Sequence, residues 1–278
     1  MPANEFYVAL YLSSLIQSGC HFSKIEEVIF SLSWCHKIAG FQDPCSDFLV
    51  QSVRLSGKRI LSCPVKKKEP ITPDILNKLV DKYGNAEASL KDLRLISMCL
   101  VGFAGFLRFS EIVNIKYSDI SFEDSFMVIF ISRSKTDKFN AGSSVVIAAT
   151  HNKTCPVEML KRNLVKGNFS HFSNDLYIFS QVCLCKSEKQ FRLRAKNVRL
   201  SYTRAREILL EALEAVGLDK TLFGVHSLRS GGATAAAAAG VSDRLFKKHG
   251  RWKSEKAKDG YVRERVHDLL SVSQHLGI

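Results

Sequence analysis

The order of apolar and polar positions predicts a mainly α chain with a small antiparallel β-sheet, an α+β fold. Apolar residues recur at helical spacing through residues 4–60. Runs rich in β-branched and aromatic side chains at 126–131 and 144–148 indicate a β-hairpin, joined by a strand near 120–122. Further helices are predicted at residues 73–82, 89–104, 110–115, 201–216, 229–239, 242–248 and 255–275.

A basic stretch bounded by prolines, CPVKKKEP, interrupts this helical pattern. We place a linker there, at residues 63–71, between a small helical domain at 1–62 and a larger domain at 72–278. The linker lysines would suit a phosphate backbone, and a solvated connector explains them equally well. These lysines are Lys66, Lys67 and Lys68.

The length of 278 residues and the 46% hydrophobic content exclude a disordered or collagen-like chain. The longest apolar run, residues 98–107, is about half of the ~20 residues that a membrane-spanning helix needs. We find neither a signal peptide at the N-terminus nor a CxxC pair among the eight cysteines. The sequence therefore predicts an intracellular protein with reduced thiols and no zinc site.

The chain has 40 Lys and Arg residues against 27 Asp and Glu, a formal charge of +13. Most of this excess lies in residues 186–278, which hold 19 basic and 10 acidic side chains. Such an excess favours a polyanionic partner, nucleic acid before an acidic membrane surface.

Two short pairs of polar residues suggest a phosphate site. Arg108 and Glu111 share one helix face, and Arg108 directly follows an apolar run where an unpaired guanidinium would be costly. We therefore expect Arg108 to enter a cleft and meet an anion, with a surface ion pair as the alternative. His226 and Arg229 lie three residues apart at a helix start, where free N–H groups favour phosphate. The alternative there is a capping histidine beside a surface arginine.

Three later side chains complete a possible catalytic set, although each has a simpler explanation. Lys135 could lie in solvent at the tip of the hairpin, and Trp252 could be a core residue. Tyr261 could be a half-buried residue with a packing role only. Together with the two arginines and the histidine, however, they supply fixed cations, proton donors and a nucleophile for in-line attack on a phosphodiester. The sequence has no carboxylate cluster for two metals and no Gly-rich ATP loop, so we expect no cofactor.

This set of residues resembles that of the tyrosine recombinases, the phage integrase family. The family's pattern is an Arg, a hairpin Lys, His-x-x-Arg, a His or Trp, and a Tyr nine residues later; Trp252 and Tyr261 are nine apart. The stretch from Ala104 (AGFLRFSEI) to the C-terminus is similar to a complete catalytic domain. The sequence HSLRSGGATAAAAAGV…HGRWKSEKAKDGYV resembles that of eukaryotic, transposon-borne members of the Crypton and DIRS type.

The resemblance implies a site-specific recombinase that acts on double-stranded DNA without metal or ATP. Tyr261 would attack the scissile phosphate and form a 3′-phosphotyrosine. A hydroxyl of a second strand would later reverse this step. Arg108 and Arg229 would bind the phosphate oxygens, and Glu111 would orient an arginine. Lys135 would be the general acid, and His226 would bond the phosphate or help to deprotonate Tyr261. Trp252 would take the position of the family's second histidine. The resemblance also implies that residues 1–62 form a core-binding (SAM-like) DNA-binding domain.

Three departures from the family pattern affect these expectations. Phe106 stands where the family usually has Gly, so the local turn could differ. Lys138 also lies in the hairpin and is an alternative to Lys135. Fewer residues precede the linker than family members often carry, so we expect the first helix of the core-binding domain to be missing.

Several other interpretations stay open at this point. Residues 233–252 could form a helix-turn-helix with Gly240 in its turn, which would make a DNA-binding regulator without chemistry. The same fold could also belong to a catalytically silent, domesticated transposon protein. A type IB topoisomerase would share the chemistry, although that family normally carries Lys or Arg where His226 stands. An intracellular scaffold is a third class. The basic residues on the second helix of the helix-turn-helix would be Arg244, Lys247 and Lys248.

An apolar stripe in residues 266–276 follows the expected nucleophile. It could pack on its own domain or dock on a neighbouring protomer. We expect a homo-oligomer, from dimer to tetramer, assembled on DNA, and a nuclear location if the source is eukaryotic.

Overall fold

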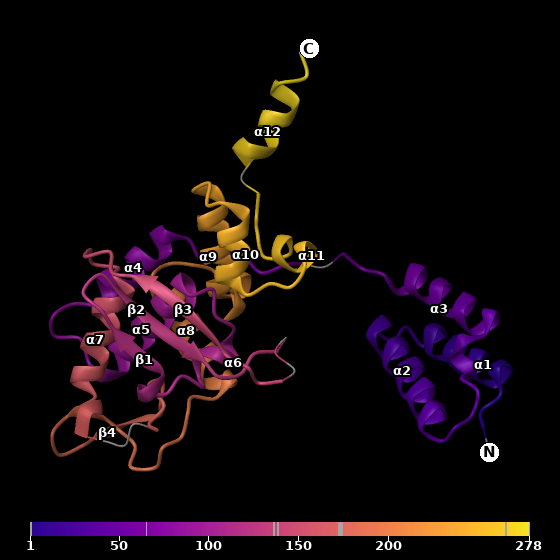
Figure 1. The fold of residues 1–278 in the computed structure, drawn as a ribbon, viewed down its shortest axis with the longest axis horizontal. Coiled ribbons are helices and arrows are strands. Elements are labelled where there is room, and N and C mark those ends of the chain that lie inside the picture. Colours follow the sequence, from indigo (N-terminus) through magenta and orange to yellow (C-terminus); the bar gives the residue numbers. More distant parts are fainter. Residues whose placement is uncertain are drawn as a thin grey trace. The chain divides into compact units, whose positions relative to one another are not determined.

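The computed structural model describes residues 2–64, 66–135, 137, 139–171, 175–264 and 266–277. The chain forms two compact units, Met1–Lys67 and Lys68–Ile278 (Figure 1). The division falls inside the stretch where the sequence predicts a linker.

The N-terminal unit consists of helices around a small core. Side chains of Asn4, His21 and Asp47 accept hydrogen bonds from backbone N–H groups at the first turns of its α-helices, and Asn and Asp are preferred residues at this position. The core includes Leu12 and Ile25, both fully buried. The helices are α1 (Glu5–Gln17), α2 (Phe22–Ile38) and α3 (Phe48–Leu61), with a short 3-10 helix at Pro44–Ser46.

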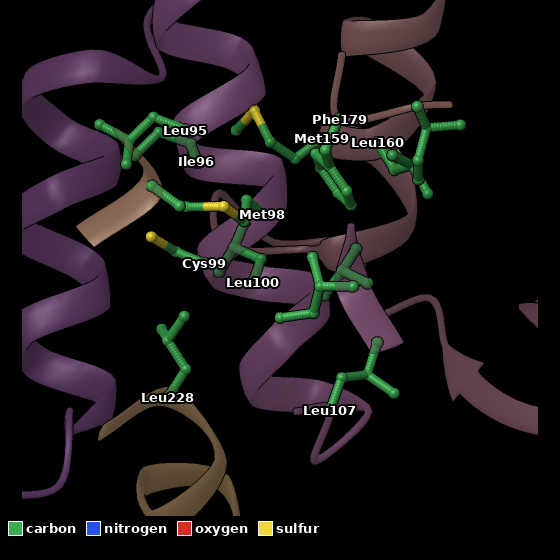
Figure 2. Packing of buried hydrophobic residues seen from close by; sticks show 14 of the residues in the cluster. Leu95, Ile96, Met98, Cys99, Leu100, Leu107, Met159, Leu160, Phe179 and Leu228 are labelled. Carbon is green, nitrogen blue, oxygen red and sulfur yellow. The ribbon is translucent and has the colours of Figure 1, made fainter. Parts of the chain in front are cut away.

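Helix α5 (Leu90–Ala104) forms the centre of the larger unit. Its side chains are buried from Leu93 to Gly102, and it packs against α4 (Pro73–Tyr83), α7 (Pro156–Lys166) and α9 (His226–Ala238). Figure 2 shows Met98 and Leu100 of α5 within this apolar packing, with Leu228 of α9 among the surrounding side chains. The core therefore fixes α9 against the C-terminal half of α5.

A three-stranded antiparallel sheet has the order β1 (Ile120–Phe122), β2 (Phe126–Ile131) and β3 (Ser143–Ala148), as the sequence predicts. Ile129 of β2 pairs with Val145 of β3, and both side chains are buried. This pairing places the long loop between β2 and β3 at one end of the sheet.

The remaining elements agree only in part with the sequence. The predicted single helix over residues 255–275 is wrong, because α11 (Glu255–Asp259) ends before Gly260 and α12 (Val266–Gln274) is separate. The hairpin of β4 (Val182–Cys185) and β5 (Gln190–Leu193) was not predicted, and neither was α7. The other elements are α6 (Phe109–Ile112), α8 (Tyr202–Ala215), α10 (Asp243–Gly250) and 3-10 helices at Tyr117–Asp119, Phe169–His171 and Lys220–Leu222.

The observed fold is therefore mainly α with small antiparallel sheets, as predicted. None of the described helices has the length and apolar character needed to span a bilayer.

Candidate active site

Three arginines surround the carboxylate of Glu111, which is fully buried. Glu111 Oε1 lies 2.8 Å from Nη1 of Arg108, and Oε2 lies 2.9 Å from Nη2 of Arg251 and 3.6 Å from Nη1 of Arg229. Burial alone would raise the pKa of Glu111, but the charge of Arg251, the backbone N–H of Arg108 and the charge of Arg229 outweigh it. The pKa is lowered, so the carboxylate stays charged and holds the three cations together.

Arg108 and Glu111 form the predicted pair on one helix face, and the pair is not on the surface. Arg108 is the N-cap of α6, and its backbone N–H donates to Oε2 of Glu111 at 2.8 Å. The side chain of Arg108 is 13% exposed, whereas that of Glu111 is not exposed at all. The guanidinium therefore keeps a narrow contact with solvent, through which an anion can approach.

Phe106 adopts a left-handed backbone conformation, with φ of 47°, at the position where the family usually has Gly. The ring is buried, with its centroid 4.7 Å from that of His249 and 5.9 Å from that of Trp252. Its carbonyl accepts a hydrogen bond from Arg229 and one from Arg251 at 3.3 Å. Phe106 therefore adopts a conformation that glycine reaches most easily, and this turn directs its carbonyl at two arginines of the cluster.

Arg229 is almost completely buried at 1% exposure. It donates to the carbonyl oxygens of Phe106 and Gly250, the latter at 2.7 Å. Burial and then the neighbouring Arg108 lower its pKa, and Glu111 opposes the shift. Because an arginine keeps its charge over the physiological range, the site retains a buried cation.

Two glycines allow α9 to pack closely on its neighbours, Gly231 on the segment before α4 and Gly232 on the C-terminal end of α5. A Cβ atom on Gly231 would lie 2.0 Å from the carbonyl oxygen of Ile71, and one on Gly232 would lie 2.1 Å from that of Phe103. No side chain fits at these distances, so the position of α9 depends on both glycines.

Tyr261 lies against Arg229 and Trp252. The Cζ atom of Arg229 is 4.7 Å from the Tyr261 ring centroid, and the Trp252 and Tyr261 ring centroids are 5.6 Å apart. Among the described residues, the Tyr261 hydroxyl has no hydrogen-bond partner. Trp252 is buried, and its Nε1–H likewise has no acceptor in the described part of the chain. Both groups therefore have a hydrogen-bonding capacity that the described residues do not use.

His226 and Lys135 belong to the same electrostatic environment. His226 is the first residue of α9, as predicted, and its surface is partly exposed. Partial burial, followed by the charges of Arg229, Arg108 and Lys135, lowers the pKa of His226, so the imidazole is neutral at pH 7. Lys135 is exposed in the β2–β3 loop, and the alternative Lys138 lies outside the described residues.

Arg251 is the member of this cluster that sequence analysis missed. It follows α10 in a left-handed conformation, with φ of 55°, and its side chain is 10% exposed. In the sequence, only its position directly before Trp252 points to a place in the site. Its partner Glu111 lies 140 residues earlier in the chain, so the pairing is visible only in the fold.

The predicted DNA-contacting lysines and arginines lie outside the cluster. The three linker lysines are exposed, and Lys68 Nζ donates to the carbonyl of Thr221. Gly240, between α9 and α10, has a φ of 71°, a left-handed conformation that favours glycine. On α10, Arg244 and Lys248 are exposed, whereas Lys247 forms an ion pair with Glu255. Over the described residues, no three His, Cys, Asp or Glu side chains are grouped to hold a metal ion.

Comparison with known proteins places this arrangement in a family. Residues 70–267 match the phage integrase family. The integrase/recombinase xerD homolog of Selenomonas ruminantium is 28% identical over 268 residues, 95% of this chain and 74% of that protein.

Solved structures share the fold. A post-cleavage complex of the XerH site-specific recombinase with a palindromic difH substrate has a TM-score of 0.66 at 17% identity, over 98% of this chain and 72% of that chain. The Tn1549 transposon integrase bound to transposon right end DNA has a TM-score of 0.63 at 13% identity, over 99% of this chain and 86% of that chain. With the family match over residues 70–267, the chain belongs to the phage integrase family of tyrosine recombinases.

Proposed function

We propose that this protein is a site-specific DNA recombinase whose nucleophile is Tyr261. The observation that carries the proposal is the position of the Tyr261 ring, with the buried guanidinium of Arg229 at 4.7 Å from its centroid. A DNA-binding regulator has no need for this convergence of a tyrosine with buried cations. The geometry therefore favours an enzyme over the helix-turn-helix regulator, and over a scaffold.

In the proposed step, the Tyr261 oxygen forms a bond to the scissile phosphorus while the bond to the 5′ oxygen breaks. Arg108 and Arg229 stabilise the charge that builds on the non-bridging oxygens. His226, which is neutral at pH 7, accepts the tyrosine proton or bonds the phosphate, and Lys135 donates a proton to the leaving 5′ oxygen. The 3′-phosphotyrosine conserves the bond energy, so a second 5′ hydroxyl can reverse the step without ATP or metal.

Trp252 and the Glu111 cluster have supporting roles. The unpaired Nε1–H of Trp252 would donate to a phosphate oxygen, although this donor is buried and the substrate must displace neighbouring side chains to reach it. Glu111 and Arg251 act as positioning residues, because their ion pair at 2.9 Å holds the carboxylate that orients Arg108 and Arg229.

DNA contacts outside the cluster follow from charge and exposure. We assign duplex binding to the three linker lysines and to Arg244, Lys247 and Lys248 of α10, where Lys247 must exchange its partner Glu255 for a phosphate. Residues 1–62 serve as a core-binding domain and residues 72–278 as the catalytic domain.

Helix α12 is proposed to contact a neighbouring protomer when the protein assembles on DNA. Its apolar side chains are exposed, including Val266 at 71% and Val272 at 68%. A neighbouring protomer of a dimer or tetramer would cover them. The Crypton and DIRS resemblance, with the nuclear location that it implies, stays a prediction.

The test uses nicked duplexes built from the DNA that flanks the gene on each side. Cleavage beside the nick releases a short fragment and traps the enzyme on DNA, so the wild type should form an adduct that survives denaturation. Tyr261→Phe should form none and should still bind the duplex. If the wild type binds these duplexes without forming an adduct, the catalytically silent alternative is favoured instead.

A further inference from the structure

A second basic site lies in the larger unit, away from the Glu111 cluster. It is a cavity of about 300 Å³ that opens between α5, the β4–β5 hairpin and the start of α8. Its lining has four cationic side chains, one amide, one aromatic ring, two aliphatic side chains and no carboxylate. The lining residues are Lys91, Arg94, Gln181, Val182, Phe191, Arg194, Leu200 and Arg204.

Arg94 is the central observation. It is 5% exposed, and the one hydrogen bond of its guanidinium among the described residues is from Nη1 to the carbonyl of Ser180, at 2.7 Å. Burying a guanidinium without an anion is costly, and a neutral carbonyl oxygen satisfies only one of its five N–H donors. Because Arg94 lines the cavity, the cavity is where an anion would meet it.

The other cations of the cavity are also poorly neutralised. Within the described part of the chain, only Arg204 has a carboxylate partner, an exposed pair with Glu207 at 3.2 Å. Arg194 donates to the side-chain oxygen of Gln181 at 3.0 Å, and Lys91 Nζ lies 5.8 Å from the centre of the Phe191 ring. Burial first, and the nearby charge of Arg204 second, lower the pKa of Arg94 to about 10.

From these observations we infer that the cavity is a phosphate-binding site, separate from the one where Tyr261 acts. Arginines recognise phosphate through paired N–H donors, and three of them with a lysine match a multiply charged anion better than a single carboxylate. The phosphate group has two possible sources, the backbone of bound DNA and a free phosphate compound. The first source rests on the proposed function, whereas the second does not.

The position of the site along α5 separates it from the cleavage chemistry. Arg94 lies ten residues before Ala104, which ends the helix, and ten residues of α-helix span about 15 Å. Arg108 follows that end. A phosphate in the cavity is therefore too far from Tyr261 to be the scissile one.

The experiment compares two double variants of the full chain that remove the same charge. Arg194→Gln with Arg204→Gln removes two exposed cations from the cavity and keeps the buried Arg94 and its hydrogen bond to Ser180. Arg192→Gln with Arg206→Gln, the matched control, removes two exposed cations from β5 and α8 that do not line it. Thermal unfolding is measured with inorganic phosphate or pyrophosphate, against chloride of equal ionic strength. Binding of a 30-base-pair duplex is measured at several salt concentrations.

For a free phosphate ligand, we expect phosphate or pyrophosphate to raise the unfolding midpoint of the wild type and the control by at least about 2 °C, and the cavity variant to lose this rise. For a DNA phosphate, we expect the cavity variant alone to lower the slope of log K against log salt by about 1 to 2. Either result supports the site. The inference is overturned if the cavity variant keeps both the phosphate-induced rise in unfolding midpoint and the salt slope of the wild type. It is also overturned if the cavity and control variants lose the same amount of that rise or slope.

These outcomes can be told apart from a failure of the proposed function. The phosphate measurement needs neither DNA nor Tyr261. If no covalent adduct forms but phosphate stabilises the wild type and not the cavity variant, the recombinase proposal fails and the cavity remains a phosphate site.

Discussion

Arg251 Nη2 lies 2.9 Å from Oε2 of Glu111, a residue 140 positions earlier in the chain. This ion pair joins the turn before Trp252 to the turn that carries Arg108. Glu111 thereby contacts arginines from three separate segments, and its carboxylate fixes their separation. The cluster is thus assembled by one buried anion, and its chemistry depends on that anion staying ionised.

The first prediction concerns Glu111→Gln. Removing the carboxylate leaves three cations without their buried partner, so the free energy of unfolding should fall by about 3 to 5 kcal/mol at pH 7. Chemical denaturation measures this loss. Glu123→Gln, an exposed glutamate, should change stability little.

The pH dependence follows from the lowered pKa of Glu111. Its contribution to stability is complete above the ordinary glutamate pKa of about 4.5 and is lost as pH falls through the lower folded value. Arg251→Met removes the strongest of the charges that lower this pKa, so the acid transition should move to higher pH. An acid transition that stays in place in both Glu111→Gln and Arg251→Met would contradict this role.

The second prediction concerns the two arginines assigned to the phosphate. Arg108→Lys and Arg229→Lys keep the charge but lose the paired N–H donors, and each should lower the single-turnover cleavage rate by about 10²–10³-fold. Duplex affinity should change much less, because many other cations contribute to it. A loss below tenfold in a variant that is folded would assign that arginine to structure alone.

The third prediction is a pH profile for His226. Because its pKa lies below the ordinary value of about 6.5, the imidazole stays neutral through neutral pH and gains a proton only in more acidic solution. If a neutral His226 accepts the tyrosine proton, kcat/KM should be level near pH 7 and fall below the ordinary histidine pKa. His226→Gln should be slower at pH 7 and should lack this acid limb. A limb that persists in His226→Gln must come from another group.

The fourth prediction tests the close packing of α9. Gly232→Ala places a methyl group 2.1 Å from the carbonyl oxygen of Phe103, so α9 must shift and take Arg229 with it. We expect a loss of about 1 to 3 kcal/mol in stability and a marked loss of cleavage. Gly224→Ala is the matched control, since its added Cβ would meet no atom within 4 Å. Equal effects of the two substitutions would mean that close packing at Gly232 does not position Arg229.

The sequence predicts some elements of this fold well and others poorly, for physical reasons. Strand β2 alternates buried Met127, Ile129 and Ile131 with more exposed residues, and such a period is readable from one chain. The β4–β5 hairpin is short and mostly exposed, so it has no burial pattern to detect. Helix α7, which was not predicted, does carry a readable apolar spacing at Val157, Leu160 and Leu164.

The candidate site shows the same contrast. The spacing of Trp252 and Tyr261 and the His226–Arg229 pair are local patterns, so the sequence alone points to them. The roles of Arg251 and of the buried Arg94 depend on partners and cavities formed by distant segments. Residue type and spacing carry no information about those contacts.

The chemical identity of the protein–DNA bond tests the role of Tyr261 as the nucleophile. Adducts trapped on a nicked duplex are digested with protease and nuclease, and mass spectrometry locates the nucleotide on the peptide that contains residue 261. We expect a 3′-phosphotyrosyl link at Tyr261, a free 5′ hydroxyl on the released strand, and no adduct in Tyr261→Phe. A link at another residue, a 5′-phosphoryl link, or an adduct that persists in Tyr261→Phe would contradict this role.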